Sequence, residues 1–448
     1  MNIILLSGGS GKRLWPLSND VRSKQFIKIF NKPEHSVPLG MDAVCEYESM
    51  VQRVYRQIKT VAPDANVTIA TSKSQVSAIH NQLGHDVGIS IEPCRRDTFA
   101  AIALATAYLH DVKGIDADEA VVVCPIDPYV DEGYFKTLNE LYEAAQSGTE
   151  NLILMGIKPT YPSEKYGYIK PVKQKGNQHW SFTEKPNKAK AEEYIKDGAL
   201  WNGGVFAYKL SYVLNKSKEL LGFFDYQSLY DAYDKLKKIS FDYAVVEQET
   251  SIAVIRYSGT WKDLGTWNTL SEAMEEKTVG DVRLSETCSN VHAINELGMP
   301  LLVMGCRDMV VAASPDGILV ADKEQSSYIK PFVDEINQQA MFAEKSWGSY
   351  RVLDVDEHSM TVKVTLNPGN RMNYHSHEKR DEVWTVIRGF GHTVVDGMEQ
   401  LVKVGDVITM AAGCKHSVVA GDKGLQLLEV QLGSEITVTD KKKFGWPL

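Results

Sequence analysis

The first 270 residues alternate between short apolar runs and longer stretches of helical periodicity, and this alternation limits the fold more than any other feature. Such alternation is typical of an α/β domain whose mostly parallel sheet is covered by helices on both faces. Ligands in such sheets bind beyond the carboxyl ends of the strands. Strands are predicted at 2–6, 67–70, 120–124, 152–157 and 252–256. Helices are predicted at 48–60, 73–83, 98–111, 133–147 and 187–196.

The predicted first strand, Ile3-Ile4-Leu5-Leu6, runs directly into a glycine-rich loop, Ser7-Gly8-Gly9-Ser10-Gly11-Lys12-Arg13. Glycines allow backbone N–H groups to approach phosphates closely, and Lys12 and Arg13 add positive charge. The loop has neither the G-K-[ST] of a P-loop nor the G-x-G-x-x-G of a dinucleotide fold. The sequence therefore predicts a phosphate-binding loop of another kind.

Length, charge and cysteine usage narrow the class of protein. The 448 residues are enough for two or three domains. The net charge of −9 argues against a broad nucleic-acid surface, although a few local cations can still bind a small anion. No apolar stretch approaches the ~20 residues of a membrane helix, and no secretory signal is expected. The six cysteines include no C-x-x-C pair, which favours reduced thiols in a cytoplasmic protein.

Two strings follow the loop, Leu14-Trp15-Pro16-Leu17-Ser18 and Ser23-Lys24-Gln25-Phe26. Together with the loop they resemble the sugar-phosphate nucleotidyltransferases, and within them the mannose-1-phosphate guanylyltransferases. The resemblance implies a Rossmann-like domain with a mixed, mainly parallel sheet, expected here over residues 1–270. It implies catalytic roles for Arg13 and Lys24. It also implies that the nucleotide is bound in the loop by Ser7, Gly8, Gly9 and Gly11.

The string Glu92-Pro93-Cys94-Arg95-Arg96-Asp97-Thr98 precedes a predicted helix that is rich in small residues. By itself it is typical of a helix N-cap at Asp97 or Thr98. The guanylyltransferases have a similar Glu-Pro-x-x-Arg-Asn-Thr string, so the resemblance implies that Glu92 and Arg96 bind the nucleotide. Asp97 stands where the family usually has Asn, which leaves the choice of nucleotide open.

Two aspartates are candidates for binding Mg²⁺, a hard ion that prefers oxygen ligands. Asp127 follows the predicted strand at 120–124, where it could also simply start a turn before Pro128. Asp263 lies in Trp261-Lys262-Asp263-Leu264-Gly265-Thr266-Trp267, which could equally be a packed corner. The second string is close to the Trp-x-Asp-x-Gly-x-Trp of the guanylyltransferases. The resemblance implies that both carboxylates hold Mg²⁺.

Three more strings resemble the sugar site of the same family: Tyr166-Gly167-Tyr168-Ile169, Phe182-Thr183-Glu184-Lys185-Pro186 and Trp201-Asn202-Gly203-Gly204. Alone, Glu-Lys-Pro is a common surface tripeptide. Their order and spacing favour a functional interpretation, in which Lys185 binds the sugar phosphate and Glu184 accepts hydrogen bonds from sugar hydroxyls. The resemblance adds Gly167 and Asn202 to this sugar-phosphate site. Gly203 stands where the family usually has Ser, so the identity of the sugar stays open.

The resemblance implies a Mg²⁺-dependent enzyme that makes GDP-mannose and pyrophosphate from GTP and mannose 1-phosphate. In this reaction a sugar 1-phosphate oxygen attacks the α-phosphorus of the nucleoside triphosphate, and positioning and electrostatic stabilisation carry the rate. One alternative is the same reaction on another sugar 1-phosphate or another nucleotide. A further alternative is a non-catalytic sensor of nucleotide sugars, although the retained cations and carboxylates argue against it.

The remainder of the chain predicts β structure. Short apolar runs separated by turn residues at 284–335 indicate a small β-helix-like segment. The strings Gly369–His377 and Gly405–His416 then fit the two motifs of a cupin β-barrel, expected at 344–448. The cupin motifs imply a site for Zn²⁺ or another divalent transition metal, because imidazole and carboxylate ligands suit such ions. Its ligands are expected to be His375, His377, Glu382 and His416.

The cupin half also resembles the type II phosphomannose isomerases, through Arg380-Asp381-Glu382-Val383-Trp384. Trp446 stands where those enzymes carry a catalytic Arg, which predicts a metal-binding cupin with reduced or absent mannose-6-phosphate isomerase activity. A purely structural or oligomerising barrel and a bifunctional enzyme are the alternatives. The expected partners are a nucleoside triphosphate and a sugar 1-phosphate, without nucleic acid or membrane, and we expect a homo-oligomer.

Overall fold

A computed structural model describes residues 1–9, 11–19, 21–32, 47–173, 178–336, 338–437 and 439–447. The chain divides into two compact units, which are described separately. The first unit comprises Met1–Gly9, Gln25–Val76 and His85–Glu275. The second unit comprises Ser10–Lys24, Ser77–Gly84 and Glu276–Leu448. Within the part of the chain that the structure describes, no helix has the length and apolar character needed to cross a membrane.

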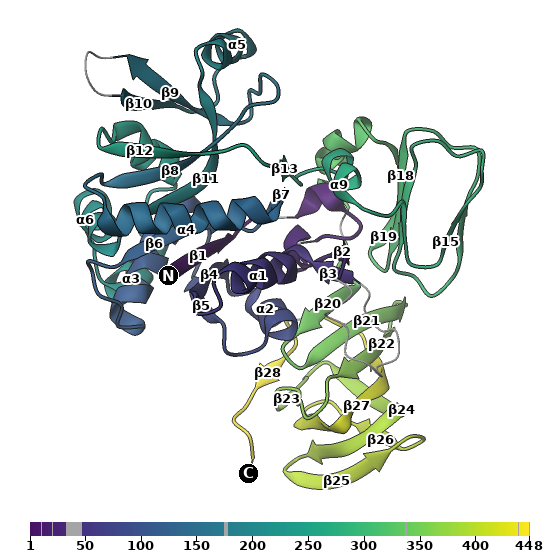
Figure 1. Cartoon of the computed structure of the whole chain (residues 1–448). Coiled ribbons are helices and arrows are strands. Elements are labelled where there is room, and N and C mark those ends of the chain that lie inside the picture. The colour runs from purple at the N-terminus through teal and green to yellow at the C-terminus, as the bar shows by residue number, and fades with distance from the viewer. Residues whose placement is uncertain are drawn as a thin grey trace. The chain divides into compact units, whose positions relative to one another are not determined.

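The first unit is built on a nine-stranded sheet with the order β10-β9-β11-β6-β1-β4-β5, in which β8 pairs with β11 and β12 (Figure 1). Its strands are β1 (Asn2–Ser7), β4 (Asn66–Ser72), β5 (Gly88–Glu92), β6 (Ala120–Pro125), β8 (Leu152–Ile157), β9 (Gly167–Lys173), β10 (Gln178–Thr183), β11 (Leu200–Lys209) and β12 (Ile252–Tyr257). Two small pairs accompany the sheet, β2 (Lys28–Asn31) with β3 (Tyr47–Ser49) and β7 (Pro128–Val130) with β13 (Trp261–Asp263).

Helices of the first unit lie on both faces of this sheet. Figure 1 shows α4 lying along one face, where it also contacts α1, while α3, α6 and α8 pack together. The helices are α1 (Met50–Val61), α3 (Asp97–Ala107), α4 (Glu132–Ser147), α5 (Lys188–Lys196), α6 (Leu210–Leu221), α7 (Tyr226–Ala232), α8 (Phe241–Ala244) and α9 (Trp267–Ala273). Ser49 begins α1 with a capping box that includes Gln52, and the Asp131 side chain caps α4.

The predicted mixed α/β sheet is confirmed, and every predicted strand and helix matches an element of the structure. Among the described residues, however, antiparallel pairings are as frequent as parallel ones, four of each. The parallel part is centred on β6-β1-β4-β5, as the alternation predicts. The antiparallel part arises because β11 runs against β6, β8 and β9, and the sequence analysis did not identify β9, β10 or β11.

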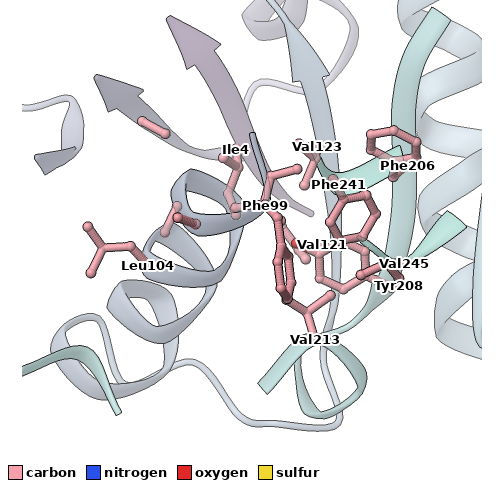
Figure 2. Close-up of a cluster of buried hydrophobic side chains, with 14 of the residues drawn as sticks. Ile4, Phe99, Leu104, Val121, Val123, Phe206, Tyr208, Val213, Phe241 and Val245 are labelled. Carbon is pink, nitrogen blue, oxygen red and sulfur yellow. The ribbon is translucent and has the colours of Figure 1, made fainter. Parts of the chain in front are cut away.

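The core of the first unit lies between the sheet and α3, α6 and α8 (Figure 2). Every residue of α3 after Thr98 is buried, which explains why this helix is made of small and apolar residues. Phe241 of α8 is completely buried and packs against Phe206 of β11, with ring centroids 4.8 Å apart. Burying such aromatic side chains contributes about 1.5–3 kcal/mol each to folding. The core therefore fixes α8 firmly beside the sheet.

The second unit contains a β-helix-like segment. Parallel pairings join β14 to β16, β16 to β18 and β15 to β17, and β19 closes this part antiparallel to β18. The strands are β14 (Thr278–Val279), β15 (Val282–Leu284), β16 (His292–Asn295), β17 (Leu301–Val303), β18 (Met309–Ser314) and β19 (Gly317–Asp322). The helix α10 (Lys330–Asp334) and the 3₁₀ turn η1 (Lys12–Leu14) also belong to the second unit, as does most of α2 (Val76–Leu83), whose side chains of Asn81 and Gln82 donate to Gly348 and Glu344.

The second unit ends in a nine-stranded antiparallel sheet that curls around its own apolar cluster. Trp384 is the largest fully buried side chain of this cluster. The fold is the expected cupin-like barrel. Its strands are β20 (Phe342–Lys345), β21 (Gly348–Val355), β22 (Ser359–Leu366), β23 (His375–Ser376), β24 (Arg380–Val395), β25 (Met398–Lys403), β26 (Val407–Met410), β27 (His416–Gly433) and β28 (Lys442–Lys443).

Candidate active site and cupin metal centre

One cavity of about 240 Å³ in the first unit brings together five of the residues predicted from sequence. It contains both predicted Mg²⁺ ligands and three of the four predicted sugar-site residues, which are Gly167, Glu184 and Asn202. The full lining is Pro125, Asp127, Pro128, Lys165, Tyr166, Gly167, Glu184, Asn202, Gly203, Gly204, Asp242, Trp261 and Asp263. Segments that are up to 138 residues apart in sequence thus meet in one place.

Strand pairing places the two metal-site aspartates next to each other. Asp127 lies between the end of β6 and the start of β7, and Asp263 is the last residue of β13. In the antiparallel β7–β13 pair, Asp263 is directly opposite Pro128, the residue after Asp127. Carboxylate oxygens from neighbouring backbone positions are the donor set that Mg²⁺ prefers. The residues present therefore fit a hard divalent ion.

The side chains of Glu184 and Phe182 lie so close to Gly167, one of the predicted sugar-site residues, that they leave no room for a Cβ atom. A Cβ atom added at Gly167 would lie 2.5 Å from Glu184 Oε2 and 2.5 Å from Phe182 Cζ. Any larger residue would therefore displace Glu184 from the cavity. Glu184 in turn forms an ion pair with its neighbour, in which Lys185 Nζ lies 2.6 Å from Glu184 Oε1. The hydrogen bond to Glu184 raises the pKa of Lys185, which stays charged at neutral pH.

Asn202 is held by a residue to which the sequence analysis assigned no role. Its Nδ2 donates to Asp242 Oδ1 at 2.6 Å, and its Oδ1 accepts from the backbone N–H of Gly204 at 3.1 Å. Burial and the nearby charge of Glu184 raise the pKa of Asp242 to about 6, although Asn202 and Lys185 oppose the shift. The sequence signal was the string Asp242-Tyr243-Ala244-Val245, which does not by itself show what the carboxylate faces.

Aromatic side chains gather beside the cavity. Tyr166 contacts both Trp201 and Trp261, with ring centroids 5.0 and 5.2 Å apart. Trp201 Nε1 donates to the hydroxyl of Tyr168 at 3.1 Å, whereas Trp261 Nε1 is buried and has no hydrogen-bond partner among the described residues. Aromatic faces of this kind can pack against the C–H surface of a sugar ring.

The predicted nucleotide residues at the end of β1 have different environments. Gly8 and Gly9 are exposed with open space around them, and Gly9 has a φ of 107°, a conformation that favours glycine. Ser7 is buried, and its hydroxyl donates to Gln75 Oε1 at 3.0 Å and accepts from Gln25 Nε2 at 2.9 Å. The two glycines can therefore approach a phosphate with their backbone, while the Ser7 side chain serves the packing of the sheet edge.

The predicted nucleotide residues Glu92 and Arg96 both contact the segment around Tyr233. The hydroxyl of Tyr233 donates to Glu92 Oε2 at 2.7 Å, and burial raises the pKa of Glu92 although this hydrogen bond opposes the shift. Arg96 Nε donates to the carbonyl of Tyr233 at 3.2 Å, and its Nη2 donates to the carbonyl of Asp234. The guanidinium of Arg96 is thus engaged by backbone carbonyls, and its binding of nucleotide stays a prediction.

The remaining predicted residues near the first strand are Gly11, Arg13 and Lys24, and they belong to the second unit. A Cβ atom at Gly11 would lie 2.8 Å from the backbone N of Lys24, so only glycine allows these backbones to approach. The side chain of Arg13 is exposed and that of Lys24 is half-buried. Arg22 anchors this segment through two hydrogen bonds to Glu296, at 2.7 and 2.9 Å.

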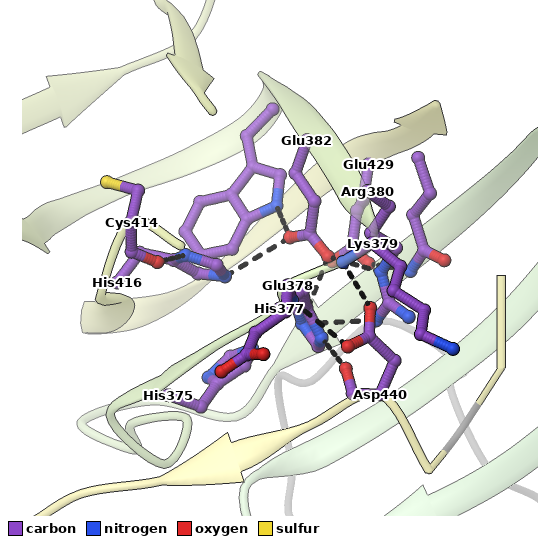
Figure 3. A network of polar contacts seen from close by, with 12 residues as sticks. His375, His377, Glu378, Lys379, Arg380, Glu382, Cys414, His416, Glu429 and Asp440 are labelled. Atoms are coloured by element: carbon purple, nitrogen blue, oxygen red, sulfur yellow. Dashed lines mark hydrogen bonds and ion pairs between the residues drawn. The ribbon is translucent and has the colours of Figure 1, made fainter. Parts of the chain in front are cut away.

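Three histidines of the cupin converge as the motif predicts (Figure 3). One ligand atom from each of His375, His377 and His416 lies within 4.8 Å of the others, and all three residues are buried. Strands β23 and β27 pair directly at His375 and His416, which explains why residues so far apart in sequence meet. Glu382 of β24 lies 3.1 Å from His377 Nε2 and 3.3 Å from His416 Nε2.

Backbone carbonyls orient all three imidazoles. The Nδ1 atom of His375 lies 2.6 Å from the carbonyl of Asn373, that of His416 lies 3.0 Å from the carbonyl of Cys414, and that of His377 contacts the carbonyl of Asp440. Because a carbonyl oxygen only accepts hydrogen bonds, each Nδ1 carries a proton, and Nε2 is the atom of each ring that is left to bind a metal. Burial lowers the pKa of His375 to about 2 and that of His377 to about 4, so these rings are neutral, as metal ligands must be.

Further buried polar groups surround the histidines, and the cupin motif did not identify them as part of the site. Arg380 donates to Glu382 Oε1 at 3.1 Å, and its Nη2 lies 3.1 Å from His377 Nε2 (Figure 3). Burial alone would raise the pKa of Glu382, but the facing imidazoles and Arg380 lower it. Glu429 is also buried, and burial together with the charge of Glu382 raises its pKa to about 7. At the C-terminal end, Trp446 lies over Arg371, 4.3 Å from ring centroid to guanidinium carbon.

Two known families match this chain, one over the α/β domain and one over the cupin-like barrel. The nucleotidyl transferase family matches residues 2–279. The chain belongs to this family. A second family, the mannose-6-phosphate isomerase C-terminal family, matches residues 334–445.

Relatives of this nucleotidyl transferase match it over nearly their whole length. The xanthan biosynthesis protein XanB of Xanthomonas campestris pv. campestris (strain B100) is 30% identical over 98% of this chain and 97% of its own. The mannose-1-phosphate guanylyltransferase of Escherichia coli K12 is 26% identical over 99% of this chain and 97% of its own. The crystal structure of mannose-1-phosphate geranyltransferase from Thermus thermophilus is 26% identical and covers 75% of this chain and 99% of its own, with a TM-score of 0.61.

Proposed function

We propose that this nucleotidyl transferase makes GDP-mannose and pyrophosphate from GTP and mannose 1-phosphate. The observation that supports this most is the single cavity that joins Asp127 and Asp263 to Glu184 and Asn202, because it unites a metal-binding and a sugar-binding donor set. The full-length similarity to the mannose-1-phosphate guanylyltransferase of Escherichia coli K12 supports the choice of substrates.

In the proposed reaction, an oxygen of the sugar 1-phosphate attacks the α-phosphorus of GTP and pyrophosphate leaves. A phosphate oxygen is already an adequate nucleophile, so the chain needs no residue that forms a covalent intermediate. Two anions must meet, and the site therefore has to offset their repulsion. Asp127 and Asp263 would hold Mg²⁺, which supplies positive charge to the phosphate oxygens when bound.

The chain's own residues would bind and orient the two substrates. Lys185 would pair with the sugar phosphate, and the ion pair with Glu184 keeps its ammonium group charged and close to the cavity. Glu184 and Asn202 would bind sugar hydroxyls. The backbone N–H groups of Gly8 and Gly9 would approach the triphosphate. Arg13 and Lys24 remain predicted to neutralise the triphosphate, and this role rests on family membership.

The first experiment measures pyrophosphate release from a matrix of four nucleoside triphosphates and several sugar 1-phosphates in the presence of Mg²⁺. We expect strong turnover with GTP and mannose 1-phosphate, and mass spectrometry should identify GDP-mannose as the second product. Turnover with a different pair would replace the proposed substrates and attribute specificity to the departures at Asp97 and Gly203. A complete lack of release would contradict the proposal and favour a sensor.

For the cupin we propose a bound divalent transition metal such as Zn²⁺, with mannose-6-phosphate isomerase activity reduced or absent. The three buried imidazoles, whose Nδ1 atoms face backbone carbonyls and leave the Nε2 atoms for a metal, fit such an ion. The position of Trp446, where the isomerases carry Arg, argues against full isomerase activity. The test is a coupled assay for conversion of mannose 6-phosphate to fructose 6-phosphate with Zn²⁺, Fe²⁺, Mn²⁺ or Ni²⁺ added, and ready conversion would make the enzyme bifunctional.

We further propose a homo-oligomer that works in the cytoplasm. The lack of a C-x-x-C pair among the six cysteines favours a reducing compartment. Light scattering coupled to size-exclusion chromatography tests the oligomer, and a monomer at micromolar concentration would contradict it.

A further inference from the structure

Asp242 lines the cavity of the first unit from a helix that the core holds in place. It belongs to α8, whose first residue, Phe241, is completely buried (Figure 2). The backbone N–H of Phe241 also donates to Thr98 Oγ1 at 2.9 Å. A side chain on such a fixed element has little freedom to move, so the carboxylate of Asp242 is a pre-organised part of the cavity wall.

The carboxylate fixes the orientation of the Asn202 amide. Asn202 Nδ2 donates to Asp242 Oδ1 at 2.6 Å, and Asn202 Oδ1 accepts from the N–H of Gly204 at 3.1 Å. In the flipped orientation, the amide oxygen would face the carboxylate and the amide NH₂ would face the N–H of Gly204. Both contacts would then be repulsive, so the amide is locked from both sides. One N–H and one oxygen lone pair of Asn202 remain for a ligand in the cavity.

Asp242 also faces the charged pair at the other side of the sugar site. Glu184 and Lys185, which lie between β10 and α5, are the two ionisable side chains that act on its carboxylate. Burial and the charge of Glu184 raise the pKa of Asp242 to about 6, whereas Lys185 and the hydrogen bond from Asn202 lower it. At neutral pH the carboxylate is therefore ionised and can only accept hydrogen bonds. Below about pH 6 it becomes protonated and loses this restriction.

We propose that Asp242 is a positioning residue for sugar recognition, which acts by locking the Asn202 amide opposite Glu184. This inference rests on the proposed function. With the amide locked, the free N–H of Asn202 donates and the carboxylate of Glu184 accepts. The pair is therefore complementary to a sugar hydroxyl that accepts from Asn202 and donates to Glu184. Asp242 touches Asn202 and not the sugar in this arrangement, so it sets specificity through another residue.

The test is a double-mutant cycle on purified full-length enzyme, with the sugar 1-phosphate that the wild type uses best. Asp242→Ala should raise the KM for the sugar 1-phosphate about 10-fold and change the KM for the nucleotide less than twofold, because one charge-assisted hydrogen bond is lost. Asp242→Asn should recover most of this loss, since its amide oxygen can still accept from Asn202. In an Asn202→Ala background, Asp242→Ala should add less than twofold.

A pH profile and a control variant complete the test. The KM for the sugar 1-phosphate should rise below about pH 6 in both proteins as the substrate phosphate gains a proton, and this rise should be steeper in the wild type than in Asp242→Asn, because Asp242 titrates as well. Ser240→Ala removes the cap of α8 without touching the carboxylate and should leave the KM unchanged. Thermal unfolding of each variant shows whether it is folded, and Asp242→Asn keeps the test decisive if Asp242→Ala is unstable.

Three results would overturn the inference. The effect of Asp242→Ala could be fully additive with that of Asn202→Ala, Asp242→Asn could be as impaired as Asp242→Ala, or Ser240→Ala could raise the KM as much. Failure of the proposed function appears elsewhere, as a wild type that releases no pyrophosphate with any substrate pair. In that case, calorimetric titration of the same variants with mannose 1-phosphate replaces KM, and equal binding by the wild type and Asp242→Ala would reject the positioning role.

Discussion

The cavity of the first unit and the histidine cluster of the second unit differ in their donor atoms. They also differ in how far their side chains are already oriented before a ligand binds. The cavity offers carboxylates and an amide beside an exposed lysine, whereas the cupin offers three buried imidazoles and one carboxylate. Oxygen donors suit hard ions such as Mg²⁺, and imidazoles suit Zn²⁺ and similar metals. Two metals of different kinds can therefore coexist in one chain without competing for the same ligands.

The two sites also differ in what must change when a ligand arrives. In the cupin, backbone carbonyls already orient all three imidazoles, so a metal meets a prepared set of Nε2 atoms. Beside the cavity, Lys185 is paired with Glu184 at 2.6 Å, and under the proposed function a sugar phosphate would have to share that lysine. The comparison supports the proposals of a resident ion in the cupin and of exchanging substrates in the cavity.

The largest expected effect comes from removing an Mg²⁺ ligand in the cavity. Asp263→Ala should lower kcat on the order of 10³-fold, because the charge that offsets the phosphates is lost from the site. Steady-state pyrophosphate release at saturating Mg²⁺ measures it. The exposed Asp197→Ala is the control and should retain wild-type kcat. Metal analysis of the cupin should give the same content for both variants, and a loss there would contradict the independence of the two sites.

Removing a cupin ligand should lower the metal content of the protein and leave nucleotidyl transfer nearly unchanged. His416→Ala should lose the resident transition metal, since a three-imidazole site loses one of its donors. Elemental analysis after desalting should show near-stoichiometric metal in the wild type and little in the variant. Added Zn²⁺ should raise the thermal midpoint of the metal-free wild type but not that of the variant. A fall of more than about twofold in kcat/KM for nucleotidyl transfer would break the distinction between the two sites.

Loss of Lys185, the lysine paired with Glu184, should weaken sugar-phosphate binding more than the chemical step. Lys185→Ala should raise the KM for the sugar 1-phosphate about 10- to 100-fold, which corresponds to about 1.5–3 kcal/mol for a hydrogen bond to a charged group. Lys185→Arg keeps the charge and should recover part of the loss, whereas the exposed Lys188→Ala should behave as wild type. An unchanged KM for Lys185→Ala would remove Lys185 from the sugar site.

The parts of the molecule that follow from local sequence were the ones that could be predicted. Buried strands such as β1 and β6 are continuous apolar runs, and helices such as α1 and α4 have clear periodicity and caps. The strand β11 was missed because Asn202-Gly203-Gly204 in its middle is typical of a turn, and the structure accommodates these residues as an irregularity in the pairing. Tertiary pairing with β6, β8 and β9 decides the outcome there.

In the candidate site, too, only the features that follow from local sequence could be predicted. The motifs predicted site roles for Asp127, Asp263 and the three cupin histidines, because each lies in a string that resembles a family motif, and the structure brings the two aspartates into one cavity and the histidines into one cluster. They could not reveal that Arg96 is engaged by the carbonyls of the Tyr233 segment, 137 residues away. Nor could they reveal the role of Asp242, since its importance lies in contacts with Asn202 and Glu184 that only the fold creates. Local strings identify groups that carry chemistry, whereas the groups that position them depend on long-range register.

The smallest expected effect concerns Gly203, which departs from the Ser of the family string that this segment resembles. A Cβ atom at this position would lie 2.4 Å from Ile157 Cδ1, the far end of a flexible side chain, and 3.8 Å from Trp261 Nε1. Gly203→Ser alone should destabilise the enzyme by about 1 kcal/mol through overpacking against Ile157. It should change the KM for the sugar 1-phosphate less than about threefold, because the site's own hydrogen bonds with Asp242 and Gly204 are untouched.

Combining this change with Ile157→Val sharpens the prediction. Removal of Cδ1 opens space for the serine, whose hydroxyl can then accept from Trp261 Nε1, a buried donor without a partner among the described residues. Ile157→Val alone should cost about 0.5–1.5 kcal/mol, but the double variant should be more stable than the sum of the two single changes. Thermal midpoints of the four proteins measure this coupling. Simple additivity would mean that the two positions do not couple and that the serine hydroxyl finds no partner at Trp261 Nε1.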